Sequence, residues 1–415
     1  MYLLKQDFNK LSITVLYRLF FSSTNCTSEI ISNRLTVLGS IIIFIILLYI
    51  TYNWFSPAYK AGGPSQSLQQ LAKHLSREQE VKVLCAHEDH DGSEIAVPAN
   101  SWVPFLDKSF VWYSSKITWY RWILFIRKQP AKVWFINGIY SLRFNLIPLL
   151  FGKGRKVISP RGMLDPGSIS QKYFQKKIYL FFWKLLGFHR SCLFHAASEV
   201  EADNIRSFFG NGVRVSIVPN LPREMDYQPM PFRKNKVLQL VTVALINPVK
   251  NYALVLESLL YCKYPLQYDI YGPIHHDTYW KQCEVVIDKM PSHIQVNYHG
   301  DIHPDAVAAV LTNAHVYIQP SRSENFGHSL FEAFSVGRPV ITSFQTPWND
   351  LLRQHAGINV EVKDTGDITE AIEFFATMDD DTLCKWSVSS NIYAKQKIDM
   401  QNIREAYHNL FFLND

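Results

Sequence analysis

The chain has 415 residues, which is long for one domain, and its 47% of hydrophobic residues are too many for a disordered protein. The net charge of +6 can favour anionic ligands or a lipid surface, but it is too small to indicate nucleic-acid binding. The six cysteines form no C-x-x-C pair, a scatter that favours buried free thiols in a reducing compartment.

The N-terminal region leaves two interpretations open. Residues 1–34 have no strong hydrophobic period, and we expect residues 1–40 to form a poorly ordered extension. The apolar run Leu35–Phe55 is long enough to cross a bilayer as a helix, or it can lead into a buried strand. We favour a first strand over Leu47–Tyr52, because the turn at Gly62-Gly63 needs a strand shortly before it. A single N-terminal membrane helix is the alternative.

From residue 47 onward, short β-rich runs alternate with helical stretches. The period of Leu68, Leu71, Ala72 and Leu75 predicts a helix over Ser65–Leu75. The strands expected in this half are Leu48–Thr51, Val81–Cys85, Val133–Ile136 and Val157–Ser159. This alternation indicates a parallel sheet that is covered on both faces.

A domain boundary is expected in Leu221–Lys236, a stretch rich in proline and charge. It separates a first domain at 41–225 from a second at 226–398. The strands expected in the second domain are Leu238–Ala244, Tyr268–Tyr271, Ile294–Tyr298, Val316–Gln319 and Pro339–Thr342. Two doubly wound α/β halves place a ligand between them, near the carboxyl ends of their strands.

The strongest signal is the segment Ser323–Phe334, S-E-N-F-G-H-S-L-F-E-A-F, which V-G-R-P-V follows at 336–340. A helix is predicted from near His328 to Gly337, so that Glu324 lies in the preceding loop and Glu332 one turn inside the helix. Amides at a helix start attract phosphate, and a carboxylate can accept hydrogen bonds from two sugar hydroxyls. Alone, the two glutamates are as well explained by a capping carboxylate and a solvated helix face.

Taken together, E-x7-E with N-F-G-H inside it and G-R-P-V after it resembles the retaining glycosyltransferases of family 4. The resemblance covers roughly residues 45–415. It implies the α/β GT-B fold, with two Rossmann-like doubly wound domains that face each other across a cleft. It also implies that Glu332 holds the donor ribose, that Glu324 lies beside the transferred sugar, and that a C-terminal helix, residues 399–415, packs back on the first domain.

Further segments match this family in the right order: A-G-G-P at 61–64, S-P-R-G-M-L at 159–164, V-P-N at 218–220 and N-P-V-K-N at 247–251. By the resemblance, the residues predicted to be catalytic are Glu324 and Lys250. Those predicted to bind the donor are Gly62, Gly63, Asn247, Lys250, Gly272, Phe326, Gly327, His328, Ser329 and Glu332. Those predicted to lie on the acceptor side are Asn137, Tyr140 and Arg161.

Two positions depart from the family pattern. Leu245 stands where an arginine is usual, so one phosphate-binding cation is missing or is supplied elsewhere, with Arg161 as a candidate. Asn137 stands where many members have a histidine, and an asparagine cannot act as a base near neutral pH. A front-face retaining mechanism can work without that base, because the leaving phosphate oxygen can take the acceptor proton.

Two other segments have chemical side chains in suggestive patterns. C-A-H-E-D-H-D at 85–91 superficially looks like a metal site, but the family is usually metal-independent, and we expect neither a metal nor a cofactor. Residues 153–190 hold nine lysines and arginines interleaved with aromatics against a single acid, Asp165. That texture fits either an interfacial surface on anionic lipid or a core-packed helix with a solvated basic side.

The function that these observations favour is sugar transfer with retention, from a nucleotide-diphosphate donor bound by the second domain. The acceptor is expected to be a glycan or a lipid-linked glycan of a bacterial envelope polysaccharide or lipopolysaccharide. We expect a cytoplasmic protein with peripheral contact to the inner face of the membrane. The alternatives are an inactive GT-B scaffold that binds a partner glycosyltransferase, which Leu245 and Asn137 favour, and a GT-B epimerase.

Overall fold

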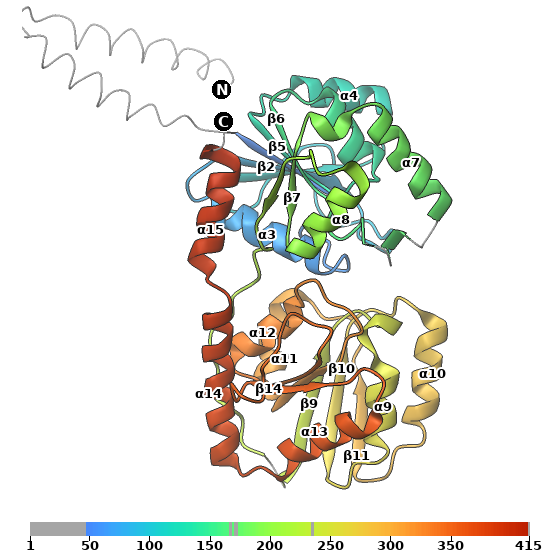
Figure 1. The fold of residues 1–415 in the computed structure, drawn as a ribbon, viewed down its shortest axis with the longest axis vertical. Helices are drawn as coiled ribbons and strands as arrows, with labels where there is room; N and C mark the ends of the chain where they lie inside the picture. The colour runs from blue at the N-terminus through green and yellow to red at the C-terminus, as the bar shows by residue number, and fades with distance from the viewer. Residues whose placement is uncertain (1–46, 166–167, 170–172, 234–235, 414–415) are drawn as a thin grey trace, which may run out of the picture. The chain divides into compact units, whose positions relative to one another are not determined.

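A computed structural model describes residues 47–165, 168–169, 173–233 and 236–413 (Figure 1). The extension expected at residues 1–40 and the apolar run up to residue 46 lie outside the described residues. No helix in the described part of the chain is long and apolar enough to span a membrane.

The first domain contains an eight-stranded sheet in the order β3-β4-β2-β1-β5-β6-β7-β8, parallel except for the pairing of β3 with β4. Its strands are β1 (Leu48–Thr51), β2 (Val81–Ala86), β3 (Trp102–Pro104), β4 (Ser109–Ser114), β5 (Val133–Asn137), β6 (Arg155–Ser159), β7 (Leu193–Ala196) and β8 (Val215–Ile217). The first strand expected at Leu47–Tyr52 is confirmed as β1. It is a central strand, paired with β2 on one side and β5 on the other. Its removal would therefore leave an unpaired edge on both β2 and β5.

The alternation of side chains along β1 explains how this sheet is covered. Tyr49 belongs to the core on one face, and Leu48 and Ile50 belong to the core on the other. The first face is packed by α4 (Trp119–Lys128), α5 (Ile147–Phe151), α7 (Tyr173–Leu185) and α8 (Glu199–Phe209), with the short segments η1 (Leu142–Leu146) and η2 (Phe188–Arg190). The second face is packed by α3 (Gly63–Leu75) and by the C-terminal helix.

The second domain contains a six-stranded parallel sheet in the order β11-β10-β9-β12-β13-β14. Its strands are β9 (Leu238–Val243), β10 (Leu266–Tyr271), β11 (Ile294–Tyr298), β12 (Val316–Gln319), β13 (Val340–Ser343) and β14 (Gly357–Val360). Its helices are η4 (Pro248–Lys250), α9 (Tyr252–Leu259), α10 (Asp277–Ile287), α11 (Pro304–Asn313), α12 (His328–Val336), α13 (Thr365–Thr377) and α14 (Asp380–Lys397). Separate cores on its two faces make it, like the first, a doubly wound Rossmann-like domain, as the sequence predicted.

The chain ends in α15 (Met400–His408) and η5 (Asn409–Leu413). Ile403, Tyr407, Leu410 and Phe411 are buried in the first domain's core beside Ile50. Arg155 at the start of β6 donates from Nη2 to the carbonyl oxygens of Leu410 and Phe411, at 2.6 and 2.8 Å. The last helix therefore packs on the first sheet, although the preceding helix α14 packs on the second.

The described cysteines are free thiols. Cys85, Cys192, Cys262 and Cys283 are buried, as expected, whereas Cys384 is exposed. Cys26 lies outside the described residues.

Candidate active site

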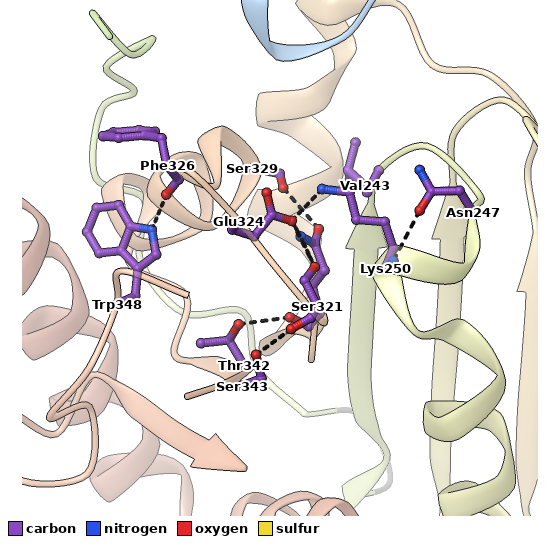
Figure 2. A network of polar contacts seen from close by, with 12 residues as sticks. Val243, Asn247, Lys250, Ser321, Glu324, Phe326, Ser329, Thr342, Ser343 and Trp348 are labelled. Atoms are coloured by element: carbon purple, nitrogen blue, oxygen red, sulfur yellow. Dashed lines mark hydrogen bonds and ion pairs between the residues drawn. The ribbon is translucent and has the colours of Figure 1, made fainter. Parts of the chain in front are cut away.

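The carboxylate of Glu324 lies at the centre of a polar network in the second domain (Figure 2). Its Oε1 accepts hydrogen bonds from Lys250 Nζ at 2.5 Å, from Ser321 Oγ at 2.8 Å and from Gln319 Nε2 at 2.9 Å. The side chains of Glu324 and Lys250 are 12% and 19% exposed. Their charges are thus largely withdrawn from water, but both groups remain accessible to a ligand.

Topology explains why residues so distant in sequence meet here. β9 and β12 are neighbours in a parallel sheet, so their carboxyl ends lie at the same edge. Lys250 belongs to η4, just after β9, while Glu324 follows β12. Asn247 fixes the lysine's backbone, because its Oδ1 accepts from the amide of Lys250 at 3.1 Å.

The first turn of α12 presents backbone amides without a side-chain cap. The residue that precedes the helix is Gly327, with a φ of 75° that favours glycine, and it supplies no capping side chain. Trp348 Nε1 donates to the Phe326 carbonyl at 2.6 Å, and Ser329 Oγ donates to Gln319 Oε1 at 3.0 Å. The turn is therefore held rigidly while its amides stay available to an anion such as phosphate.

Glu332 is not on a solvated helix face. It is 3% exposed, and Arg223 from the segment between the two domains lies beside it, with Nε 3.1 Å from Glu332 Oε1. Arg223 Nη1 also donates to the Pro304 carbonyl at 2.9 Å. Burial raises the pKa of Glu332 to about 7, and the Arg223 guanidinium opposes that rise. The carboxyl group therefore titrates near neutral pH.

The glycine turn predicted to approach the donor lies against the second domain. A Cβ on Gly63 would come 2.9 Å from His328 Cδ2, and one on Gly62 would come 3.6 Å from Leu245 Cδ1. Burial, together with the positive charges of Arg161 and Lys250, lowers the pKa of His328 to about 3. His328 is thus a neutral imidazole next to the glycine turn.

Gly272 is required by a close backbone approach. Its φ is 136°, and a Cβ there would lie 2.1 Å from the carbonyl oxygen of Ala244. Tyr298 Oη donates to the Gly272 carbonyl at 3.0 Å, and the rings of Tyr271 and His299 stack at 4.4 Å nearby. This turn follows β10, which is paired with β9 in the sheet. It therefore borders the carboxyl end of β9, where the loop that holds Lys250 begins.

Of the residues predicted for the acceptor side, Asn137 and Arg161 contact each other. Arg161 Nε donates to Asn137 Oδ1 at 2.9 Å, and its Nη1 donates to Asn220 Oδ1. Asn137 is buried, and its Nδ2 donates to the Phe135 carbonyl, so both its side-chain oxygen and its side-chain nitrogen have a partner. Tyr140 Oη donates to the Met163 carbonyl at 3.3 Å, and burial raises the pKa of Tyr140 to about 12.

The C-A-H-E-D-H-D loop makes structural contacts rather than a cluster of ligands. Asp89 accepts from the amides of Tyr59 and Lys60, and Asp91 pairs with Lys60 Nζ at 2.6 Å. Over the described residues, no group of three or more histidines, cysteines or acids is arranged to hold a metal ion. That the reaction needs no metal stays a prediction.

Sequence reasoning missed several site residues. Gln319 and Ser321 donate hydrogen bonds that orient Glu324, and Arg223 places a positive charge beside Glu332. His195 is buried between Ser159 and Tyr407. Only Gln319 and Ser321 carried a usable signal, because Gln319 ends a predicted strand and Ser321 follows two residues later.

Comparisons with known proteins agree with this geometry. Residues 228–386 match the family model for glycosyl transferases group 1, a stretch that contains Lys250, Glu324 and Glu332. The gpi3 subunit of phosphatidylinositol N-acetylglucosaminyltransferase from Schizosaccharomyces pombe is 27% identical over 161 residues, 37% of this chain. The match spans 34%, about a third, of that relative's length.

Solved structures of glycosyltransferases share the whole two-domain fold. Sucrose-phosphate synthase from Thermosynechococcus elongatus matches with a TM-score of 0.68 and 14% identity, over 89% of this chain and 100% of its own. HepE of Anabaena in complex with UDP and glucose matches at 0.64 and 12%, over 88% and 99%. WaaG, a glycosyltransferase involved in lipopolysaccharide biosynthesis, matches at 0.62 and 15%, over 89% and 100%. These likenesses show the GT-B fold that the sequence predicted.

Proposed function

We propose that this chain transfers a sugar from a nucleotide-diphosphate donor to a glycan or a lipid-linked acceptor. The grounds are the match of residues 228–386 to glycosyl transferases group 1 and the GT-B fold. The observation that carries the proposal is the meeting of Lys250, Glu324 and the uncapped first turn of α12 at the carboxyl edge of the second sheet. A cation and free helix amides suit a diphosphate, and a carboxylate beside them suits sugar hydroxyls.

A uridine nucleotide is the donor class to test first. The HepE structure contains UDP and glucose, and the gpi3 relative is named for N-acetylglucosaminyl transfer. In this chain, Glu332 would accept hydrogen bonds from the ribose hydroxyls, and the turn at Gly272 would border the base. Tyr271, stacked on His299, offers that base an aromatic surface.

The reaction proposed is a front-face transfer with retention. The bond between the anomeric carbon and the donor phosphate oxygen breaks, and a bond forms between that carbon and the acceptor oxygen on the same face. The acceptor proton passes to the departing phosphate oxygen, so no protein base is needed. Lys250 and the amides of α12 would stabilise the negative charge that develops on the leaving diphosphate.

This scheme fits the engaged state of Asn137. Its amide is bonded to Arg161 and to the Phe135 carbonyl, so it would help to shape the acceptor side rather than to move a proton. The same residue supports the rival scaffold function, in which the chain binds a partner enzyme and catalyses no turnover.

As part of the proposal, we assign the acceptor to bacterial envelope polysaccharide synthesis, at the cytoplasmic face of the membrane.

Donor binding tests the proposal at its simplest. In a thermal-shift screen of nucleotide sugars, at least one should stabilise the full chain, and calorimetry should then give its affinity. Glu332→Ala should cost roughly 1.5–3 kcal/mol of binding, because a charged hydrogen-bond partner is lost. Glu284→Ala, an exposed carboxylate on α10, is the matched control and should bind normally. Unchanged donor affinity in Glu332→Ala would remove Glu332 from the site.

A further inference from the structure

Helix α7 exposes a stripe of large apolar side chains. Phe174, Ile178, Phe181 and Leu185 are 78, 58, 62 and 66% exposed, and their spacing places them on one side of the helix. Leu180 and Trp183 on the other side are buried in the core of the first domain. The core on the buried side of α7 is therefore formed without these four side chains. The stripe that they form runs about 17 Å along the helix axis.

Helix α4 contributes further apolar side chains on the same face of the sheet. Trp119 and Tyr120 are 68 and 58% exposed, while Trp122 of the same helix is buried in the core that also holds Trp183 of α7. The loop between them ties the helices together, because Trp122 Nε1 donates to the Arg143 carbonyl and Tyr179 Oη donates to the Ile139 carbonyl. Figure 1 shows both helices on this side of the first sheet.

The charge of this region is strongly one-sided. Residues 108–198, which include α4, α5 and α7, contain sixteen lysines and arginines and a single acid, Asp165. Their net charge is therefore +15, whereas the whole chain carries +6, so the remaining residues are net acidic. Exposed Lys177 and Lys184 flank the stripe on α7, and exposed Arg121, Arg127 and Lys128 accompany Trp119 on α4.

We propose that the outer face of α4 and α7 docks the first domain on an anionic lipid bilayer. Phe and Leu side chains enter the boundary between headgroups and acyl chains, Trp and Tyr suit the headgroup level, and the basic flanks meet the lipid charge. An acidic polysaccharide or a nucleic acid would use the cations but leave these six exposed side chains of α4 and α7 in water. The inference deepens the proposed function, because it places a lipid-linked acceptor at the domain expected to bind it.

Vesicle flotation of the full chain tests the surface. The vesicles are phosphatidylcholine alone, or phosphatidylcholine with about one-third phosphatidylglycerol, whose charge is needed for the basic flanks to act. The double variant Phe181→Ser/Leu185→Ser should lower partition into the anionic vesicles by roughly tenfold or more, from the lost burial of two large apolar side chains. The matched control removes two exposed apolar side chains of the second domain, Val285→Ser/Leu352→Ser, and should partition like the parent.

A label on the helix separates this surface from the apolar N-terminal run. With Cys26 and Cys384 replaced by serine, an environment-sensitive fluorophore at Ile178→Cys should shift to the blue with anionic vesicles and be quenched by lipid-borne nitroxide. The same label at Leu352→Cys should report water. Equal flotation of parent and double variant, or a label at 178 that stays in water, would overturn the proposal. The proposal would also be overturned if the double variant changed only the oligomeric state, from dimer to monomer. It would be overturned as well if the double variant lost binding to an anionic polymer rather than to vesicles. Donor titration of the same variants should be unaltered, which separates failure here from failure of the proposed sugar transfer.

Discussion

At the scale of single residues, the pair Glu332–Arg223 makes donor binding sensitive to pH. Burial puts the folded-state pKa of Glu332 at about 7, so the carboxylate that would accept the ribose hydroxyls forms only as the pH rises through neutrality. Donor affinity should therefore increase by roughly tenfold between pH 6 and pH 8, since a hydrogen bond to a charged group is the stronger one. Calorimetry over that range measures it.

Two substitutions identify the group that titrates. Glu332→Gln should flatten the pH profile, and Arg223→Met should move its midpoint upward because the opposing cation is lost. Exposed Arg353→Met is the control for the arginine. The free energy of unfolding should fall as the pH rises from about 4.5 to about 7, because the folded protein keeps the proton that the unfolded chain releases there. An unchanged profile in Glu332→Gln would mean that another group controls binding.

Glu324 is expected to act on turnover rather than on affinity. Glu324→Gln keeps the hydrogen bonds of Ser321 and Gln319 within reach but removes the charge beside Lys250 and the sugar. Turnover should drop by roughly a hundredfold, in the range seen when one preorganised electrostatic contact is lost, while donor affinity changes little. Steady-state kinetics with calorimetry separates the two, and exposed Glu257→Gln on α9 is the control. Equal losses of turnover and affinity would contradict the role.

At the scale of elements, the C-terminal helix is part of the first domain's core. A chain that ends at Ile398 would lose four buried side chains, those of Ile403, Tyr407, Leu410 and Phe411. At about 1.5–3 kcal/mol for each, the loss is about 6 kcal/mol or more, comparable with the stability of a whole domain. Urea denaturation should show the first domain unfolding at much lower denaturant, with the second domain less affected. Tyr407→Phe keeps the ring and should cost about 1 kcal/mol, for its bond to His195. A truncated chain with an unchanged midpoint would contradict this packing.

The elements that could be predicted from the sequence are those with a local signal. β1, α3 and α12 follow from an apolar run, a helical period and the glycines that bound a helix. β3, β4, β7, β8 and β14 were missed, and all five lie at the edge of a sheet or one strand in from it. The pairing of Arg223 with Glu332 could not be predicted either. Arg223 stands in an irregular segment, and only the folding of both domains brings it to α12. His195 and Tyr407 likewise meet across 212 positions of sequence.

At the scale of the whole molecule, β1 is the first element of the described chain and a central strand of the first sheet. Since β1 is bonded to both β2 and β5, a chain that starts near residue 44 retains the complete first sheet. We expect it to fold, stay in solution without detergent and bind donor like the full chain, by circular dichroism and calorimetry. Loss of the fold would show that preceding residues are needed. The α4 and α7 surface is kept in that chain, so its vesicle binding should persist.

The central claim is that this two-domain chain transfers a sugar with retention at the Lys250–Glu324 site. The most direct measurement is NMR of the first product formed from the nucleotide sugar that binds best, with excess EDTA present and water or glycan as acceptor. The account predicts release of the nucleoside diphosphate and a sugar that keeps the donor's anomeric configuration before mutarotation. It also predicts that Lys250→Met abolishes the signal, while Lys281→Met on α10 retains it. An inverted product would contradict the retaining mechanism, and a folded, donor-binding chain that releases nothing would establish the scaffold alternative.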